Sequence, residues 1–160
     1  MSDKGPSGFQ PGAWISPPPG RLVGKGHPAG DFLEAWKWDV LEQELGYLKV
    51  AAELPPHVMN PRGQLFGGFT PTYVDLISLF TTRAGQDRTK GPFHWMATTN
   101  MRVDYFEPII GPRFVMESQL EKRRGRTLFV STRFLQDDVL AVFALTTMRE
   151  VALDRPLGDA

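Results

Sequence analysis

The chain has 160 residues, with 18 Lys plus Arg, 18 Asp plus Glu and no cysteine. This length suits one domain with its own core. A formal net charge of zero gives no general attraction to nucleic acid or to an anionic membrane. Without cysteine there is no disulfide, thiolate nucleophile or cysteine-ligated zinc. No signal-like apolar segment or long apolar run occurs, so a cytoplasmic protein is expected.

Residues 1–30 are rich in Pro and Gly, include the stretch SPPPG, and show no apolar periodicity. They predict an N-terminal arm ahead of a domain that spans residues 31–155. The glycines of GKGHPAG, at residues 24–30, are best interpreted as loop glycines, because no strand precedes them and no helix clearly follows.

Alternating apolar and polar residues predict two strands after Trp36, with a turn near Gly46. Between Phe69 and Thr82 the apolar residues recur at helical spacing and cover almost every side. Such a helix is expected to be buried. Pro is tolerated in its first turn, and Gly85 supplies a stop.

Four further segments alternate in the same way, near residues 94–106, 114–122, 126–136 and 139–151. The sequences RRGR and QDD have the composition of hairpin turns. We expect the four strands to form an antiparallel meander. In the first of them, one face is predicted to carry Trp95, Ala97, Thr99, Met101, Val103 and Tyr105. The predicted fold class is α+β, with one long central helix wrapped by a mainly antiparallel sheet of five to six strands.

Asp75 is the one carboxylate within the apolar helix. Burying an ionised aspartate among apolar side chains costs several kcal/mol unless it is compensated. One interpretation is structural, with Asp75 bonded to a backbone amide or to an arginine. The other is a general base or nucleophile whose pKa is raised by desolvation.

Gly67 and Gly68 stand where this helix begins. Glycine permits close backbone approach, and the free amides and dipole of a helix start favour negative charge, so the pair would suit an oxyanion hole. A simple hinge is the alternative. Gly67 and Asp75 are eight residues apart, which separates them by about 12 Å along one helix. If both act on one carbonyl, they come from different subunits, as antiparallel helices in a symmetric homodimer would allow.

The stretch N-P-R-G-Q-L-F-G-G-F-T-P-T-Y-V-D, residues 60–75, resembles the signature of hotdog-fold acyl-CoA thioesterases of the phenylacetyl-CoA and 4-hydroxybenzoyl-CoA type. The similarity extends over residues 36–151 and includes TTNMRVDYFEPI and EKRRGRTLFVSTRF. The resemblance implies a hotdog fold, hydrolysis of an acyl-CoA thioester without metal or redox cofactor, and a homodimer or a dimer of dimers.

By position, the resemblance implies that Asp75 activates water or attacks the thioester carbonyl itself. Gly67 would donate its backbone amide to the thioester oxygen, and Asn60 would help to hold that oxygen or the water. Thr98 would support the acid across the dimer. Taken alone, Asn60 is better explained by an Asx turn, and Thr98 is an ordinary strand residue.

One departure from the family pattern concerns Phe66, which stands where the signature has a histidine assigned to the leaving thiolate. His57 is nearby in sequence, although a loop histidine without a role is the better interpretation. Substrate binding is assigned to Phe66, Gly68 and Tyr73, and an acyl pocket for aryl or medium-chain groups would also include Phe69, Phe93 and Trp95. Core packing is the alternative for each aromatic residue.

Arg123, Arg124 and Arg126 cluster with Lys122 around one turn. The resemblance implies that they bind the phosphates of coenzyme A, for which arginine is well suited. A solvated basic hairpin explains the same residues.

A non-catalytic acyl-CoA-binding protein is the main alternative function, because the missing histidine permits it. A thioesterase for carrier-protein thioesters shares the chemistry and stays open. A hotdog dehydratase or hydratase is disfavoured, since no histidine lies between His57 and His94. The acyl group and the choice between dimer and tetramer are left undetermined.

Overall fold

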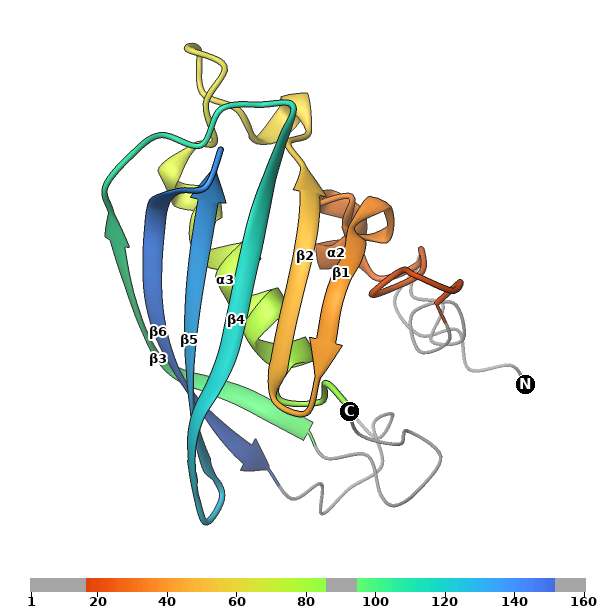
Figure 1. The fold of residues 1–160 in the computed structure, drawn as a ribbon, viewed down its shortest axis with the longest axis vertical. Helices are drawn as coiled ribbons and strands as arrows, with labels where there is room; N and C mark the ends of the chain where they lie inside the picture. The colour runs from red at the N-terminus through yellow and green to blue at the C-terminus, as the bar shows by residue number, and fades with distance from the viewer. Residues whose placement is uncertain (1–16, 86–94, 152–160) are drawn as a thin grey trace, which may run out of the picture.

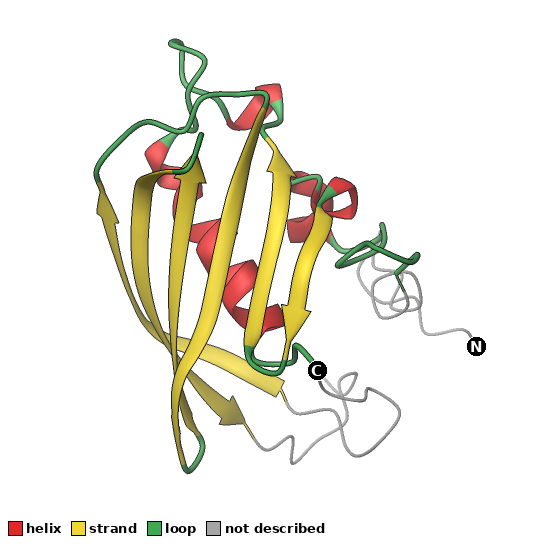
Figure 2. Ribbon diagram, viewed as in Figure 1, coloured by secondary structure: helices red, strands yellow, loops and turns green. Residues whose placement is uncertain are grey.

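The computed structural model describes residues 17–85 and 95–151. Its strands form one sheet: β1 Asp39–Glu44, β2 Tyr47–Glu53, β3 Trp95–Tyr105, β4 Arg113–Arg124, β5 Thr127–Gln136 and β6 Val139–Val151. Its helical segments are α2 Pro28–Phe32, η1 Ala35–Lys37, η2 Pro56–Val58, η3 Gly67–Phe69 and α3 Thr70–Thr81. The long helix α3 crosses one face of the sheet, which curves around it (Figure 1, Figure 2). Within the described ranges, no helix has the length and apolarity to cross a membrane.

The predicted fold class is confirmed: one central helix packs on a six-stranded antiparallel sheet. The predicted four-strand meander is wrong in one respect. The strand order is β1-β2-β4-β5-β6-β3, so β4, β5 and β6 meander while β3 lies at the far edge beside β6. Alternation in a sequence reports which face a residue occupies but not which strand is its neighbour. The first hairpin is also confirmed, although β1 begins at Asp39 because η1 occupies Ala35–Lys37.

The predicted helix is confirmed as α3, whose first turn contains Pro71. Because proline has no amide hydrogen to offer, this is the part of a helix that tolerates it. Gly85 follows the helix with a φ of +70°, and a Cβ built there would lie 2.7 Å from the backbone nitrogen of Leu45. Only glycine combines this left-handed conformation with so close a backbone approach, so Gly85 can pack directly against the β1–β2 turn.

The core between α3 and the sheet is built around aromatic rings. Tyr73 is fully buried and stacks on Trp38, with ring centroids 5.6 Å apart and an interplanar angle of 14°. Its other neighbours are Phe114 and Phe134, which it meets edge-on at 5.5 Å and 6.3 Å. Aromatic side chains bury the largest areas per residue, so this cluster contributes strongly to the attachment of α3.

A β-bulge in β3 changes which of its side chains face α3. The pairing of β3 with β6 shifts around Thr99, so Thr98 lies opposite Met148 while Met101 lies opposite Thr146. Met148 and Thr146 are both buried, and residues that lie opposite each other in an antiparallel pair share a face. Thr98 and Met101 therefore both face α3. The prediction that Trp95, Ala97 and Thr99 share the face of Met101 is wrong, because the bulge inserts one extra residue and reverses the alternation.

Part of the predicted N-terminal arm packs against the domain. Residues 1–16 lie outside the described ranges. Leu22 and Val23, however, are buried in the core, and Arg21 pairs with Asp39 at 2.6 Å. The amide of Val40 also donates to a carbonyl in this segment. The compact part of the described chain thus begins before residue 31, because two apolar side chains in a Pro- and Gly-rich segment are enough to attach it.

Candidate active site

Asp75 lies in the middle of α3, but its side chain is exposed to solvent in the single chain. The residues around it in the helix, Val74, Leu76 and Ile77, are buried. The prediction that Asp75 is buried by its own helix and sheet is therefore wrong. The sheet covers α3 from one side only, so a helix that is apolar nearly all round still presents one face that its own chain does not cover.

The side chain of Thr98 contacts Asp75. Its Oγ1 donates a hydrogen bond to Oδ1 of Asp75. The bulge in β3 turns Thr98 toward the helix, as described above, and so brings the two side chains together. Thr98 was expected to support the acid across a dimer, whereas here the contact is made within one chain. A hydroxyl that donates to a carboxylate fixes the orientation of the carboxylate.

Gly67 and Gly68 begin η3, immediately before α3, and both are exposed. The first amides of a helix have no acceptor within the helix, and none of the hydrogen bonds between described segments uses these two. A Cβ built at Gly68 would lie 2.7 Å from the ring of Phe66, so that ring covers this glycine closely. The geometry leaves two amides at a positive helix end, available to an oxygen that carries negative charge.

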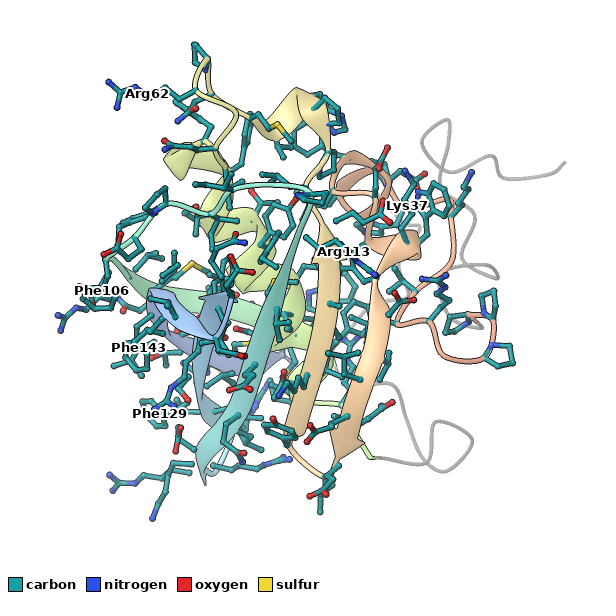
Figure 3. All side chains as sticks on the ribbon, turned by 45° about the horizontal axis from the view of Figure 1, so that its top comes forward. Lys37, Arg62, Phe106, Arg113, Phe129 and Phe143 are labelled. Carbon is teal, nitrogen blue, oxygen red and sulfur yellow. The ribbon has the colours of Figure 1, made fainter. Side chains whose placement is uncertain are left out.

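Asn60 shapes the loop before these glycines. Its Oδ1 accepts hydrogen bonds from the amides of Arg62 and Gln64, at 2.8 Å and 3.1 Å. Its Nδ2 lies 3.3 Å from Oε1 of Gln64. This is the Asx turn that the sequence offered as the alternative. The side chain of Arg62 points outward from the loop (Figure 3). Within the single chain, the side chain of Asn60 is thus engaged by its own loop.

Phe66 is 51% exposed and begins a row of aromatic rings. Its ring meets Phe69 at 5.5 Å, Phe69 meets Phe32 at 5.3 Å, and Phe32 meets His57 at 5.1 Å. The Nε2 of His57 lies 2.5 Å from the carbonyl oxygen of Phe32. His57 is therefore attached to α2 at the far end of this row, and Phe66 itself is the residue beside the glycines.

Tyr73, predicted to bind substrate, is instead a core residue with no exposed surface. Helical periodicity turns it toward Trp38 and the sheet. The prediction for Phe93 lies outside the described residues. Trp95 is 41% exposed at the start of β3. Among the described aromatic residues predicted for an acyl pocket, Phe66 and Phe69 lie next to Gly67 and Gly68.

Arg123, Arg124 and Arg126 lie at the β4–β5 hairpin and are exposed. Arg123 pairs with Glu150 at 2.6 Å, and Nε of Arg126 donates to the Glu150 carbonyl at 3.0 Å. Figure 1 shows this hairpin at the opposite end of the sheet from the loop that precedes α3. One chain therefore does not bring these arginines to Gly67.

Two further features lie apart from the predicted site residues. A cavity of about 240 Å³ is lined by Tyr47, Glu117, Ser118, Gln119, Glu121, Ser131 and Arg133, none of which was predicted to act. In the described ranges, no group of three or more His, Cys, Asp or Glu side chains is arranged to hold a metal ion.

Sequence reasoning missed Tyr105, the last residue of β3. Its hydroxyl donates to the carbonyl oxygen of Gly67 at 2.8 Å. Its ring lies 3.7 Å from the position that a Cβ on Gly67 would take. No sequence signal marks this contact, because it depends on how β3 crosses the start of α3.

No protein-family model matches the chain, and no curated protein matches it in sequence. Solved structures do match. A putative thioesterase of Ralstonia eutropha JMP134, related to phenylacetic acid degradation, has a TM-score of 0.64 at 20% identity, with 78% of this chain and 91% of that chain covered. A hypothetical thioesterase of Streptococcus pneumoniae TIGR4, solved with coenzyme A, has a TM-score of 0.63 at 14% identity, with 72% and 87% covered.

A protein of Streptococcus mutans UA159 bound to acetyl CoA has a TM-score of 0.62 at 19% identity, with 72% of this chain and 90% of that chain covered. At these identities the likeness establishes the architecture. The central helix on a six-stranded sheet is therefore the hotdog fold that these thioesterases share.

Proposed function

We propose that this protein is a thioester hydrolase that cleaves acyl-CoA to a free acid and coenzyme A. The observation that carries the proposal is the pairing of Asp75 with Thr98 on the uncovered face of α3, whose start offers two free glycine amides. The fold shared with named thioesterases, two of which were solved with coenzyme A or acetyl CoA, supports the same chemistry. The reaction needs a base or nucleophile and a site for the oxyanion, and these residues would supply both.

In the proposed reaction, Asp75 takes a proton from water while the water oxygen bonds to the thioester carbonyl carbon. The carbonyl oxygen becomes an oxyanion held by the amide of Gly67. When the intermediate collapses, the carbon–sulfur bond breaks and coenzyme A leaves as a thiolate, which takes a proton from Asp75 or from solvent. Direct attack by Asp75 would give an anhydride, and water would then hydrolyse it to the same products.

A homodimer is part of the proposal. Gly67 and Asp75 of one chain are separated by about 12 Å along the helix axis, which is too far for both to act on one carbonyl. β3 lies at the edge of the sheet, and an exposed edge strand is a ready surface for pairing with another chain. A second copy along β3 would cover the exposed face of α3 and bring its Gly67 toward Asp75 across a two-fold axis.

Phe66 influences what this hydrolase would accept. Its phenyl ring cannot donate a proton, so the coenzyme A thiolate would leave unprotonated, which its low basicity permits. The exposed rings of Phe66 and Phe69 next to the glycines favour an aryl or medium-chain acyl group, which would bury apolar surface against them. Arg123, Arg124 and Arg126 would bind the phosphates of coenzyme A from another subunit.

The test compares release of free thiol from aromatic and aliphatic acyl-CoAs by the wild type and by Asp75→Asn. The variant should lose turnover, by at least about a hundredfold, while it still binds coenzyme A in calorimetry. Asp138→Asn is a matched control, since Asp138 lies in the β5–β6 turn at a φ of 63°, where asparagine is well tolerated. Folded wild type that binds acyl-CoA and hydrolyses none of the panel would overturn the hydrolase and favour the acyl-CoA-binding protein.

A further inference from the structure

Strand β3 makes two polar contacts with the α3 region. Thr98 reaches Asp75 from the middle of the strand, and Tyr105 reaches Gly67 from its end. Both Tyr105 and Thr98 lie on the face of β3 that looks toward the helix, because each is opposite a buried residue of β6. The same strand thus contacts both of the groups to which the proposed reaction assigns a role.

The contacts around Gly67 fix the peptide planes on either side of it. On the N-terminal side, the carbonyl of Phe66 accepts the amide of Phe69 at 2.9 Å. On the C-terminal side, the carbonyl of Gly67 accepts the amide of Thr70 and the hydroxyl of Tyr105, the latter at 2.8 Å. Glycine has more backbone freedom than any other residue. Hydrogen bonds to both flanking carbonyls remove that freedom and hold the Gly67 amide in one direction.

Stability alone does not explain the Tyr105 hydroxyl. The Gly67 carbonyl already has a partner in the Thr70 amide. Both Tyr105 and Gly67 are exposed, so water would replace the hydroxyl at small cost if it were removed. A contact from a separate strand adds something else, since it ties the helix start to β3, the edge strand along which the second copy is proposed to pair. Oxyanion sites depend on donors that are held in place before the charge develops.

We propose that Tyr105 is a positioning residue that holds the Gly67 amide in the direction needed for the thioester oxygen. This inference rests on the hydrolase proposed above. Tyr105 touches neither water nor thioester in this role and acts through the Gly67 carbonyl. Its ring packs against Gly67 at van der Waals distance, so the phenyl group restricts the glycine from one side while the hydroxyl fixes its carbonyl.

The test is Tyr105→Phe, which keeps the ring and removes the hydroxyl. Its kcat should fall by about tenfold, less than the loss expected when an oxyanion donor is removed outright. KM and the melting temperature should stay close to those of the wild type. The matched control is Tyr47→Phe, a hydroxyl removed from β2, which should leave kcat unchanged. In a Gly67→Pro background, which lacks the amide, Tyr105→Phe should cause no further loss, because the two changes act through one group.

Amide hydrogen exchange of Phe69 and Thr70, whose amides donate to the carbonyls of Phe66 and Gly67, can be followed by NMR and does not depend on turnover. Exchange should be faster in Tyr105→Phe than in the wild type and unaltered in Tyr47→Phe. Unchanged exchange, or an active wild type matched by Tyr105→Phe in kcat, would overturn the positioning role and leave the hydrolase intact. A wild type that hydrolyses no thioester would instead overturn the proposed hydrolase, and the contact between Tyr105 and Gly67 would then have no role in catalysis.

Discussion

Gly67→Pro removes a single hydrogen atom from the proposed oxyanion site. The substitution deletes the backbone amide that is expected to hold the thioester oxygen. Proline is well tolerated at the first position of a helix, which Gly67 occupies in η3. The residue before a proline must be extended, and Phe66 already is, with φ of −66° and ψ of 124°. The fold should therefore accept this change.

The expected effects on activity and stability have opposite signs. Loss of one oxyanion donor costs about 2.7–4 kcal/mol of transition-state stabilisation, or about a hundredfold to a thousandfold in kcat. Replacing glycine by proline where the backbone fits restricts the unfolded chain and stabilises the fold by about 0.4–1 kcal/mol. Gly67→Pro should thus be at least as resistant to urea as the wild type and nearly inactive.

The assay is thiol release at saturating acyl-CoA, measured beside urea unfolding of the same preparations. Gly67→Ala is the control, because it keeps the amide and its Cβ would meet the Tyr105 ring at an ordinary 3.7 Å. It should retain most of the rate. Full activity in Gly67→Pro would refute the assignment of this amide as the oxyanion donor. Equal losses of kcat in Gly67→Pro and Gly67→Ala would show that the rate depends on the space at Gly67 and not on its amide hydrogen.

Three further predictions concern the dimer, Thr98 and Tyr73. If Gly67 and Asp75 act across subunits, refolding inactive Asp75→Asn together with inactive Gly67→Pro should restore about a quarter of the wild-type rate. About half of the dimers are then mixed, and each mixed dimer has one of its two sites intact. No recovery would place both groups in one chain. Thr98→Val should lower kcat by about tenfold, since a hydrogen bond to a charged group is worth about 1.5 kcal/mol, and Thr98→Ser should restore it; equal rates in both would exclude the hydroxyl. Tyr73→Phe should raise the free energy of unfolding by about 1 kcal/mol, because the Tyr73 hydroxyl is buried without a hydrogen-bond partner among the described residues. Burial raises the pKa of Tyr73, so the unfolded chain loses this proton first above about pH 10 and the wild type is further destabilised there. The gain from Tyr73→Phe should therefore widen with rising pH in urea titrations, and a constant gain would contradict this.

Several elements could be predicted because their cause is local. The helix over residues 70–81 follows from apolar spacing, a proline in the first turn and the stop at Gly85. The β4–β5 and β5–β6 hairpins follow from turn residues between alternating strands. The glycine pair at a helix start and the lone carboxylate likewise stand out in the sequence, and the structure places both on exposed surface.

Other features have no local cause, and there the sequence analysis was wrong or silent. The place of β3 beside β6 depends on how the whole sheet closes around α3. The bulge at Thr99 is invisible in the alternation of the sequence, yet it decides that Thr98 meets Asp75. The contact of Tyr105 with Gly67 joins residues far apart in the chain.

The sequence by itself determined the fold class, the central helix and the residues that offer charge and free amides, because periodicity, turn chemistry and helix-end chemistry act over a few residues. Only the tertiary structure decided that Tyr73 is a core residue, that Asn60 is engaged in its own loop, and that Asp75 lies on a face its own chain leaves uncovered. Burial and partnership depend on which distant segments pack together, and a helix that is apolar on nearly every side does not reveal which side its own sheet will cover.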